Sequence, residues 1–393
     1  MVNLVIKNES SVSVSQEATY GTYVAPVDGT SYLEVGDSIN VPSSGREAIE
    51  SNNLTSTVEG TASRLGKASV SGEIPMDLKA GSNEGDVAPC DVLLNSAMGG
   101  RTQFTTEVTT KTGHTVSQLE IEDADISKFT VNHPILVKEA GNFQIRIVTA
   151  IDSTGGAANI TIFPDLEAIP ADNVVIGKST VYFLDSKLAK SFSQEFNLGG
   201  KLKHEFAGLQ ASSFSIADWT TGTTPKINFN FEGAEIATPT VAAPSYSPVF
   251  PTSEVPTILR AQAWINDKSV HYNELSLGLE SNLGEAPSAA KKSGVLKKSI
   301  VKQLVSGKIN PYMDGDNTDM FEMYNLNEDF SLFSYTFNPT ATEGEFKEAV
   351  VLWIPQAKMT ENPAEEVNGN MTDGVVFKAH RDLGNDTVFL GFM

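Results

Sequence analysis

The strongest constraint on the fold of this 393-residue chain is a repeated alternation of apolar and polar residues with a period of two. In SVSGEIPMDL (residues 69–78), Val70, Ile74, Met76 and Leu78 alternate with polar residues. In KINFNFEG (226–233), Ile227, Phe229 and Phe231 do the same. Because successive side chains of a strand point to opposite faces, this pattern predicts half-buried antiparallel strands.

Other segments repeat the pattern, and helices are few. Further strands are predicted at 143–150, 181–184, 274–279 and 387–392, separated by turns rich in glycine, serine, threonine and asparagine. Helices are predicted only at 89–100, which Pro89 opens and Gly99-Gly100 ends, and at 317–326, with Thr318 or Asp319 as N-cap. The fold class is therefore all-β and mainly antiparallel.

The lysine-containing segment 287–307 has two interpretations. It fits a basic helix, or a flexible loop that leads into a strand from Ser299. We favour the loop.

Several short sequence matches indicate an internal repeat. IESNNL (49–54) resembles LESNLG (279–284), SGEIPM (71–76) resembles SGKINP (306–311), and CDVLL (90–94) resembles TDMFE (318–322). FSQEFN (192–197) resembles FSYTFN (333–338) at a smaller offset. The change of offset indicates extra residues in the first half, whose strand and turn signals fit a small antiparallel barrel or sandwich.

The expected organisation is a β-sandwich domain with a short helix, present twice, with a small β-domain inserted in the first copy. A proline-rich segment separates the copies and should be extended. The predicted parts are an N-terminal arm (1–30), a first domain (31–101 and 190–237), an insert (102–189), a linker (238–256) and a second domain (257–393).

Charge and composition argue against several classes of protein. A net charge of −21 disfavours stable binding to nucleic acid or to anionic membranes. The single cysteine, Cys90, cannot form an intramolecular disulfide, and no apolar stretch is long enough to span a bilayer. No secretory signal is visible, so we expect synthesis in a cytoplasm.

No catalytic, cofactor or metal motif is found. The five histidines are far apart in sequence, and DGDNTD (314–319) lacks the glycine and glutamate of an EF-hand loop. Nucleophile-elbow, dinucleotide and P-loop motifs do not occur. Acidic pairs such as Glu120/Asp123 and Glu365/Glu366 fit solvated loops. The basic cluster Lys291, Lys292, Lys297 and Lys298 fits a solvated loop or a patch that meets an acidic neighbouring subunit. We therefore expect no enzyme, no cofactor and no metal site.

The order of these features resembles the major tail tube protein of long-tailed, siphovirus-like bacteriophages. The resemblance rests on QEATYGTYVAP (16–26), VSGEIPMDL (70–78), the helix CDVLLNSAMGG (90–100), the segment 191–219 and PKINFNFEG (225–233). It covers most of 16–100 and 190–235, and the second half more weakly. The insert resembles accessory β-domains that decorate some tubes. Segment 16–26 would be an arm that lies on a neighbouring subunit.

The resemblance implies subunits that join into stacked rings around a channel for DNA ejection. Two tube domains per chain would give a homotrimer with pseudo-sixfold symmetry, with a homohexamer as the alternative. It implies a virion protein of the tail whose partners are itself, the tape measure, tail tip and terminator proteins, and double-stranded DNA in transit, with no membrane. The polar faces of the two alternating segments would line an acidic channel, with candidate lumen-facing residues Ser71, Glu73, Asp77, Asn228, Asn230 and Glu232.

Two other functions fit the same pattern. The chain could be another ring-forming tail component, such as a terminator, adaptor or baseplate protein. It could also be a carbohydrate-binding or adhesive β-protein whose insert is the binding module.

Overall fold

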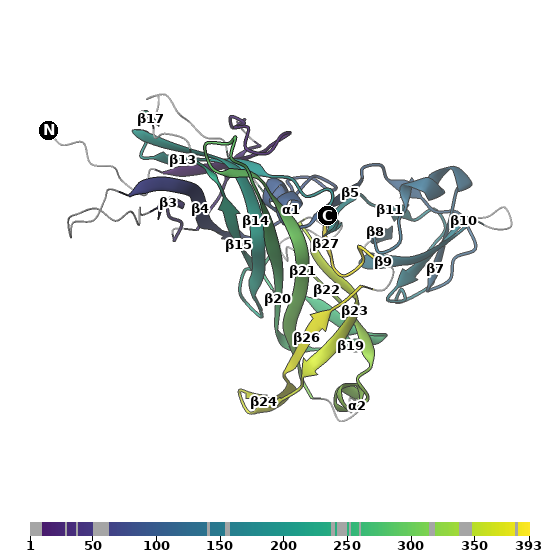
Figure 1. The fold of residues 1–393 in the computed structure, drawn as a ribbon. Coiled ribbons are helices and arrows are strands. Elements are labelled where there is room, and N and C mark those ends of the chain that lie inside the picture. Colours follow the sequence, from purple (N-terminus) through teal and green to yellow (C-terminus); the bar gives the residue numbers. More distant parts are fainter. Residues whose placement is uncertain are drawn as a thin grey trace, which may run out of the picture.

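The computed structural model describes residues 10–27, 30–36, 38–49, 63–139, 142–153, 158–236, 240–241, 250, 253–258, 261–313, 319–337, 348–381 and 384–393. Within these residues there are one large sheet, a six-stranded sheet and a two-stranded hairpin, all antiparallel (Figure 1). The all-β prediction is confirmed. Most of the 49–54 match, most of DGDNTD and most of the linker lie outside the described residues.

The first half of the large sheet is built around four long strands. β3 (Ser43–Ile49) pairs with β4 (Arg64–Asp77), β4 with β15 (Lys226–Gly233), and β15 with β14 (Leu202–Thr220). The other end of β14 pairs with β13 (Phe192–Leu198), which continues to β1 (Ser11–Gln16) and β2 (Tyr32–Leu33). The short strands β16 (Glu235–Ile236) and β17 (Thr240–Val241) also pair with β14.

The second half has the same strand order. β20 (Tyr272–Pro287) pairs with β21 (Val295–Pro311), β21 with β26 (Val375–Ala379), and β26 with β23 (Val350–Glu361). Then β23 pairs with β22 (Asp329–Thr336), and β18 (Gln262–Ile265) and β19 (Lys268–Val270) follow. The register of β14 shifts where it pairs with β13 and again where it pairs with β15. The register of β23 shifts at the equivalent residues, where it pairs with β22 and with β26.

One packing motif occurs in both halves. Phe231 stands opposite Gly72 in the sheet, as Phe377 stands opposite Gly307. The ring of Phe231 makes an edge contact with Phe192 at 5.7 Å between centroids, and Phe377 makes one with Phe330 at 5.9 Å. All four phenylalanines are buried in one continuous hydrophobic core.

β14 and β20 join the halves into one sheet. Ser213 stands opposite Glu280, and Phe214 opposite Leu279. The long strands β4, β15, β14, β20 and β21 therefore lie side by side across the molecule (Figure 1).

The two predicted helices are present. α1 (Asp91–Ala97) buries Leu93 and Leu94 against the sheet, and Gly99 follows it with φ of +89°, a conformation that favours glycine. α2 (Asp319–Leu326) buries Met320 and Met323. The basic-helix interpretation of 287–307 is wrong, because only 288–294 form a turn between β20 and β21. The strand begins at Val295, four residues earlier than predicted.

The six-stranded sheet comes from the middle of the chain, in the order β6 (Val108–Thr109), β11 (Val175–Ile176), β8 (Pro134–Glu139), β9 (Asn142–Asp152), β10 (Ala158–Phe163) and β7 (Gln118–Ile121), with a 3-10 helix at Asp123–Lys128. Two strands of the predicted insert range 102–189 belong to the large sheet instead. β12 (Ser179–Leu184) pairs there with β5 (Gly99–Phe104) and with β27 (Phe389–Phe392).

The six-stranded sheet shares a core with the second half of the large sheet. Ile145 and Ile147 of β9 pack in one buried cluster with Phe333, Val351 and Trp353. In addition, Trp353 Nε1 donates a 2.9 Å hydrogen bond to Asn132 Oδ1. The sheet is therefore attached through a hydrophobic interface and not only through its two chain connections.

The segment after β1 is hydrogen-bonded to its own chain. Glu17 is buried, and its carboxylate accepts hydrogen bonds from the hydroxyls of Ser191 and Ser193, both 2.7 Å, and from the backbone N–H groups of Gly21 and Gly208, both 2.8 Å. The Tyr23 hydroxyl donates a 2.7 Å hydrogen bond to Glu195.

Candidate assembly and channel surface

The six candidate lumen-facing residues lie together on one face of the large sheet. Glu73 of β4 stands opposite Asn230 of β15, and Ser71 opposite Glu232. Asp77 and these four side chains are exposed, and Asn228 is half-buried. The opposite face is core, with Val70, Ile74, Ile227 and Phe229 buried as the alternation predicts.

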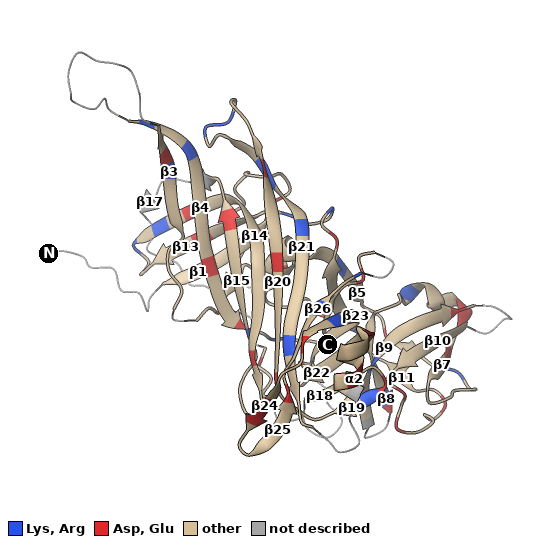
Figure 2. Ribbon diagram, turned by 60° about the horizontal axis from the view of Figure 1, so that its bottom comes forward, with Lys and Arg blue, Asp and Glu red and all other residues tan. Residues whose placement is uncertain are grey.

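The same polar face continues into the second half. By register it includes Ser213 and Ser215 of β14, Gly278 of β20 and Ser306 of β21. Figure 2 shows these three strands side by side. Small and polar side chains therefore cover its middle, together with the exposed carboxylate of Glu280, which stands opposite Ser213.

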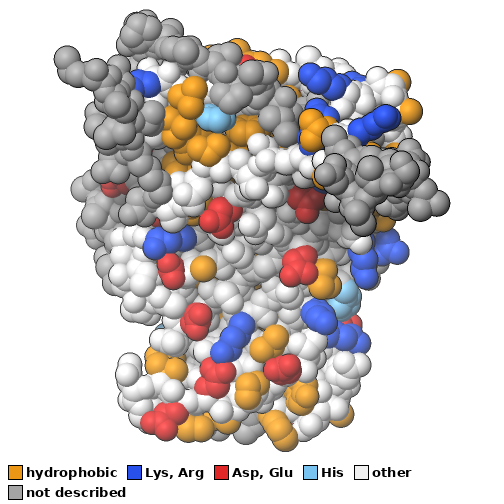
Figure 3. All heavy atoms as spheres, turned by 60° about the vertical axis from the view of Figure 1, so that its left-hand side comes forward, with side chains coloured by type: hydrophobic (Ala, Val, Ile, Leu, Met, Phe, Trp, Pro, Cys, Tyr) orange, Lys and Arg blue, Asp and Glu red, His pale blue; other side chains and the backbone are white. Residues whose placement is uncertain are grey.

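The charges on this face are mixed, in contrast to the expected acidic wall. In the shared register, Ser306 takes the place of Ser71, so Lys308 takes the place of Glu73, and Lys378 that of Glu232. Sequence alternation found the acidic strip of the first half but not the basic residues of the second. From the side shown in Figure 3, acidic and basic side chains are interspersed across the middle of the molecule.

Ion pairs link parts of the surface. Lys308 Nζ lies 2.7 Å from Glu365 of the hairpin formed by β24 (Ala364–Val367) and β25 (Asn370–Asp373). Lys298 Nζ lies 2.8 Å from Glu232, which connects the two halves. Both pairs are partly exposed to solvent, and pairs at a fully exposed surface contribute at most about 1 kcal/mol each.

Several strand edges have no strand beside them within the described part of the chain, and two of them correspond to the edges that pair at the β14–β20 junction. β3 pairs with β4 alone. The last residues of β23 pair with β26 on one side, whereas β22 reaches only Lys358 on the other. The corresponding end of β14 pairs with β20. Unpaired edges are templates for pairing with another chain.

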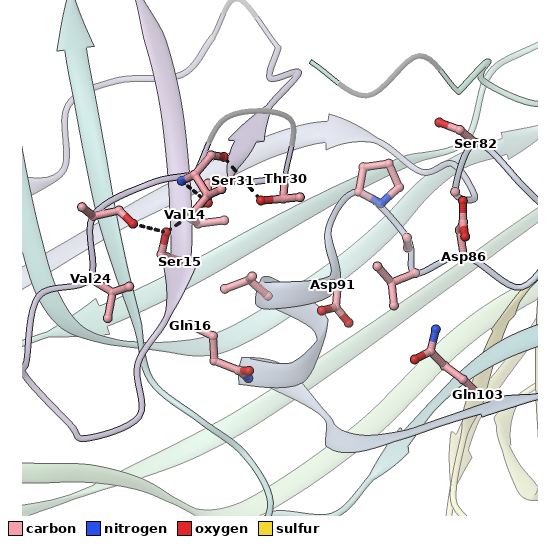
Figure 4. Close-up of a pocket in the computed structure, with 17 residues that line it drawn as sticks. Val14, Ser15, Gln16, Val24, Thr30, Ser31, Ser82, Asp86, Asp91 and Gln103 are labelled. Atoms are coloured by element: carbon pink, nitrogen blue, oxygen red, sulfur yellow. Dashed lines mark hydrogen bonds between the residues drawn. The ribbon is translucent and has the colours of Figure 1, made fainter. Parts of the chain in front are cut away.

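Two of the larger cavities among the described residues are lined by groups that already have partners. One of about 590 Å³ lies between residues 14–31 and α1, and its polar residues bond to one another and to neighbours (Figure 4). Ser15 bonds to Ser31 at 3.1 Å, and Asp91 accepts 2.7 Å hydrogen bonds from Arg101 and Tyr182. A second cavity of about 680 Å³ is lined by Trp264, whose ring stacks on Tyr335.

The reactive groups are buried or dispersed. Burial raises the pKa of the Cys90 thiol well above its ordinary value, so this cysteine stays protonated. His133 is buried and hydrogen-bonds Ser179 at 3.0 Å, and His380 lies 2.8 Å from Asp329. Among the described residues no three metal-ligating side chains come together, and no helix is long and apolar enough to cross a membrane.

The comparison with protein families agrees with this scaffold of strands and open edges. A model of a phage tail tube protein family matches residues 7–373, nearly the whole chain, including both halves of the sheet. No curated protein matches the chain. With the fold and this match together, the chain belongs to the phage tail tube protein family and is a structural component of a phage tail.

Proposed function

We propose that three copies of this chain close into a ring that is one layer of a tail tube, and that the polar face of the large sheet lines its channel. In this proposal residues 31–101 with 190–237 and residues 257–393 are two copies of one tube domain, 102–189 is an insert, and 238–256 is the linker. The observation that carries it is the β14–β20 junction, which joins two sheets of the same strand order.

This junction supplies the geometry for the contact between chains. Because β23 corresponds to β14 and β3 to β20, the last residues of β23 can pair with β3 of the next chain as the first residues of the β14–β20 junction pair. Beyond them the chain turns into the hairpin of β24 and β25. In this pairing Asn362 takes the place of Phe214, and Ser44 of the next chain takes the place of Leu279. Asn362 and that Ser44 would therefore stand opposite each other. Each chain has one edge of each kind, so the contact is head-to-tail, which forms a ring when the rotation between neighbouring chains is a whole fraction of a turn.

The number of strands supports three copies. Each chain contributes β3, β4, β15, β14, β20, β21, β26 and β23 to the wall. With strands about 4.8 Å apart and tilted by about 35–45° as in other barrels, three chains give a backbone diameter of roughly 45–50 Å. After side chains this leaves room for a DNA duplex, whereas six chains would enclose about twice the diameter.

The lining suits a conduit for DNA. Hydroxyl and amide groups keep the wall hydrated, and the carboxylates around Glu73 repel phosphate over a Debye length of about 8 Å. Because of Lys308 and Lys378, the charge of the wall alternates in sign around the ring. This limits both the repulsion of DNA and its retention in the channel. The protein would be made in the host cytoplasm and would contact tape measure, tail tip and terminator proteins in the virion.

Disulfide cross-linking tests the ring contact. We expect the double variant Asn362→Cys with Ser44→Cys to give covalent dimers and trimers, and no longer species, on oxidation of purified assemblies. The control Asn362→Cys with Glu47→Cys places the thiols three residues out of register, beyond the reach of a disulfide. Cys90 is buried and should not interfere.

Three outcomes would contradict the proposal. A ladder that extends to six chains favours the homohexamer. Equal cross-linking of the control pair removes the proposed register. A protein that stays monomeric without cross-links, and shows no pore by negative-stain microscopy, favours an adhesive β-protein.

A further inference from the structure

The two ends of strand β21 carry surfaces of opposite charge. The turn at its start, with the first residues of the strand, is SAAKKSGVLKK (288–298), which has four lysines and no acidic residue. The segment beside its end is ENPAEEVNGNMTD (361–373), which has four acidic residues and no basic one. We call the first the basic tip and the second, which contains β24 and β25, the acidic hairpin. Figure 2 shows them at opposite ends of the long strands.

The basic tip is a defined part of the fold. The N–H of Ser288 donates to the carbonyl of Gly294 at 2.9 Å, which closes the turn. Neighbouring β4 holds it from the side, because the N–H of Ala68 donates to the carbonyl of Ser293 at 3.0 Å. Lys291, Lys292 and Lys297 are exposed, and Leu296 and Val301 beside them are 53% and 70% exposed.

The acidic hairpin is also held in place. Glu365 receives Lys308 Nζ at 2.7 Å and Asn310 Nδ2 at 2.9 Å, and the N–H of Met313 donates to the carbonyl of Met371 at 2.9 Å. Glu361 and Glu366 are exposed, and Met313 and Met371 are 41% and 48% exposed. It therefore presents carboxylates and apolar side chains together.

One molecule cannot bring these two surfaces together. β21 has 17 residues, which at about 3.3 Å each separate its ends by on the order of 50 Å. Surfaces that complement each other from opposite ends of a molecule form a heterologous contact, which repeats without closing when copies are related along the strand direction.

We propose that the basic tip docks on the acidic hairpin of a second copy of this chain in the adjacent ring. This rests on the proposed rings and assigns the surface that connects one ring to the next. Lysine–carboxylate attraction would set orientation and association rate, and burial of Leu296 and Val301 against Met313 and Met371 would supply affinity.

Charge reversal of the full-length chain tests the docking. Lys291→Glu with Lys292→Glu should abolish tubes in negative stain and leave single rings, because neither side chain contributes to the proposed ring contact. Glu361 lies beside that contact, so the partner variant changes Glu366→Lys alone. The control Lys187→Glu with Lys190→Glu makes the same charge change in an exposed loop and should form tubes of normal length.

Mixing gives the decisive measurement. With the two variants in equal amounts, the new glutamates of one chain can pair with the new lysine of the other, and the unchanged tip of the second chain can still meet the unchanged hairpin of the first. Tubes of alternating rings should therefore return in part. Wild-type tube length for the lysine variant, or no recovery on mixing, would overturn the docking. Loss of rings as well as tubes would assign the tip to ring closure and also overturn it. If the wild-type chain forms no rings, the proposed function itself fails.

Discussion

The ring of Phe231 covers Gly72 on the core face of the sheet so closely that a Cβ at residue 72 would lie 2.6 Å from Phe231 Cζ. The same contact occurs at Gly307, where a Cβ would lie 2.5 Å from Phe377 Cζ and also 2.5 Å from the carbonyl of Ser276. Glycine at both places lets the ring tip of a phenylalanine from the neighbouring strand approach the backbone closely. This packing is a core requirement of each half.

We expect Gly72→Ala to destabilise the protein by about 1–3 kcal/mol, because the added methyl group must displace a buried ring. Gly307→Ala should cost at least as much, since a carbonyl also blocks the position. Urea unfolding of dissociated chains measures both. The control is Gly45→Ala on β3, where a Cβ meets nothing within 4 Å. Equal stability of the Gly72 and Gly45 variants would contradict the packing argument.

The alternation in the sequence predicted which side chains face the core and which face solvent, because that pattern depends only on neighbours within one strand. It could not identify partner strands, since β4 and β15 are far apart in the chain. The SGEIPM/SGKINP match aligns Gly72 with Gly307, as the register does.

Another match was misleading. FSQEFN and FSYTFN align Phe192 with Phe333, but the structural equivalent of Phe192 is Phe330. A shift of three residues moves a side chain to the other face of a strand, and Phe333 packs against the six-stranded sheet. Nothing in the sequence singled out Lys308 and Lys378, because an outward-facing lysine is common on any strand. Only the strand register shows that they occupy the positions equivalent to Glu73 and Glu232.

Glu17 should be essential for holding residues 17–27. Its carboxylate accepts four hydrogen bonds, two from backbone N–H groups, and Glu17→Gln replaces one acceptor oxygen by a donor. We expect a loss of about 2–4 kcal/mol and faster proteolysis near Tyr20. Thr19→Val, at an exposed neighbouring position, serves as control. Unchanged proteolysis of the Glu17 variant would show that β1 alone fixes the segment.

The six-stranded sheet and the second half should unfold together. Ile145 is fully buried between them, so Ile145→Ala should lower the free energy of unfolding by about 2–5 kcal/mol and shift a single transition. Val131→Ala, at a 42% exposed position, should have little effect. A separate early transition in calorimetry would contradict a shared core.

The same interface predicts the result of deleting 102–189. The deletion removes β12, which bridges β5 and β27, and uncovers Phe333, Val351 and Trp353. We therefore expect insoluble protein, not a slimmer tube. Soluble tubes from this deletion would show that the insert is peripheral.

Acid should destabilise the protein through His133. Burial lowers the pKa of this imidazole from 6.5 to about 4. Its Nε2–H group can donate to the hydroxyl of Ser179, which itself donates to the carbonyl of Pro134. Because the unfolded chain takes up the proton first, stability is complete above pH 6.5 and falls as the pH drops toward 4, by about 2–3 kcal/mol. His133→Gln cannot be protonated in this range, so the difference in urea midpoint between wild type and variant should shrink as the pH falls from 7.5 to 4.5. His380→Gln changes an exposed surface pair and serves as the matched control. A difference for His133→Gln that stays constant over this range would show that His133 is protonated in the folded protein as readily as in the unfolded chain.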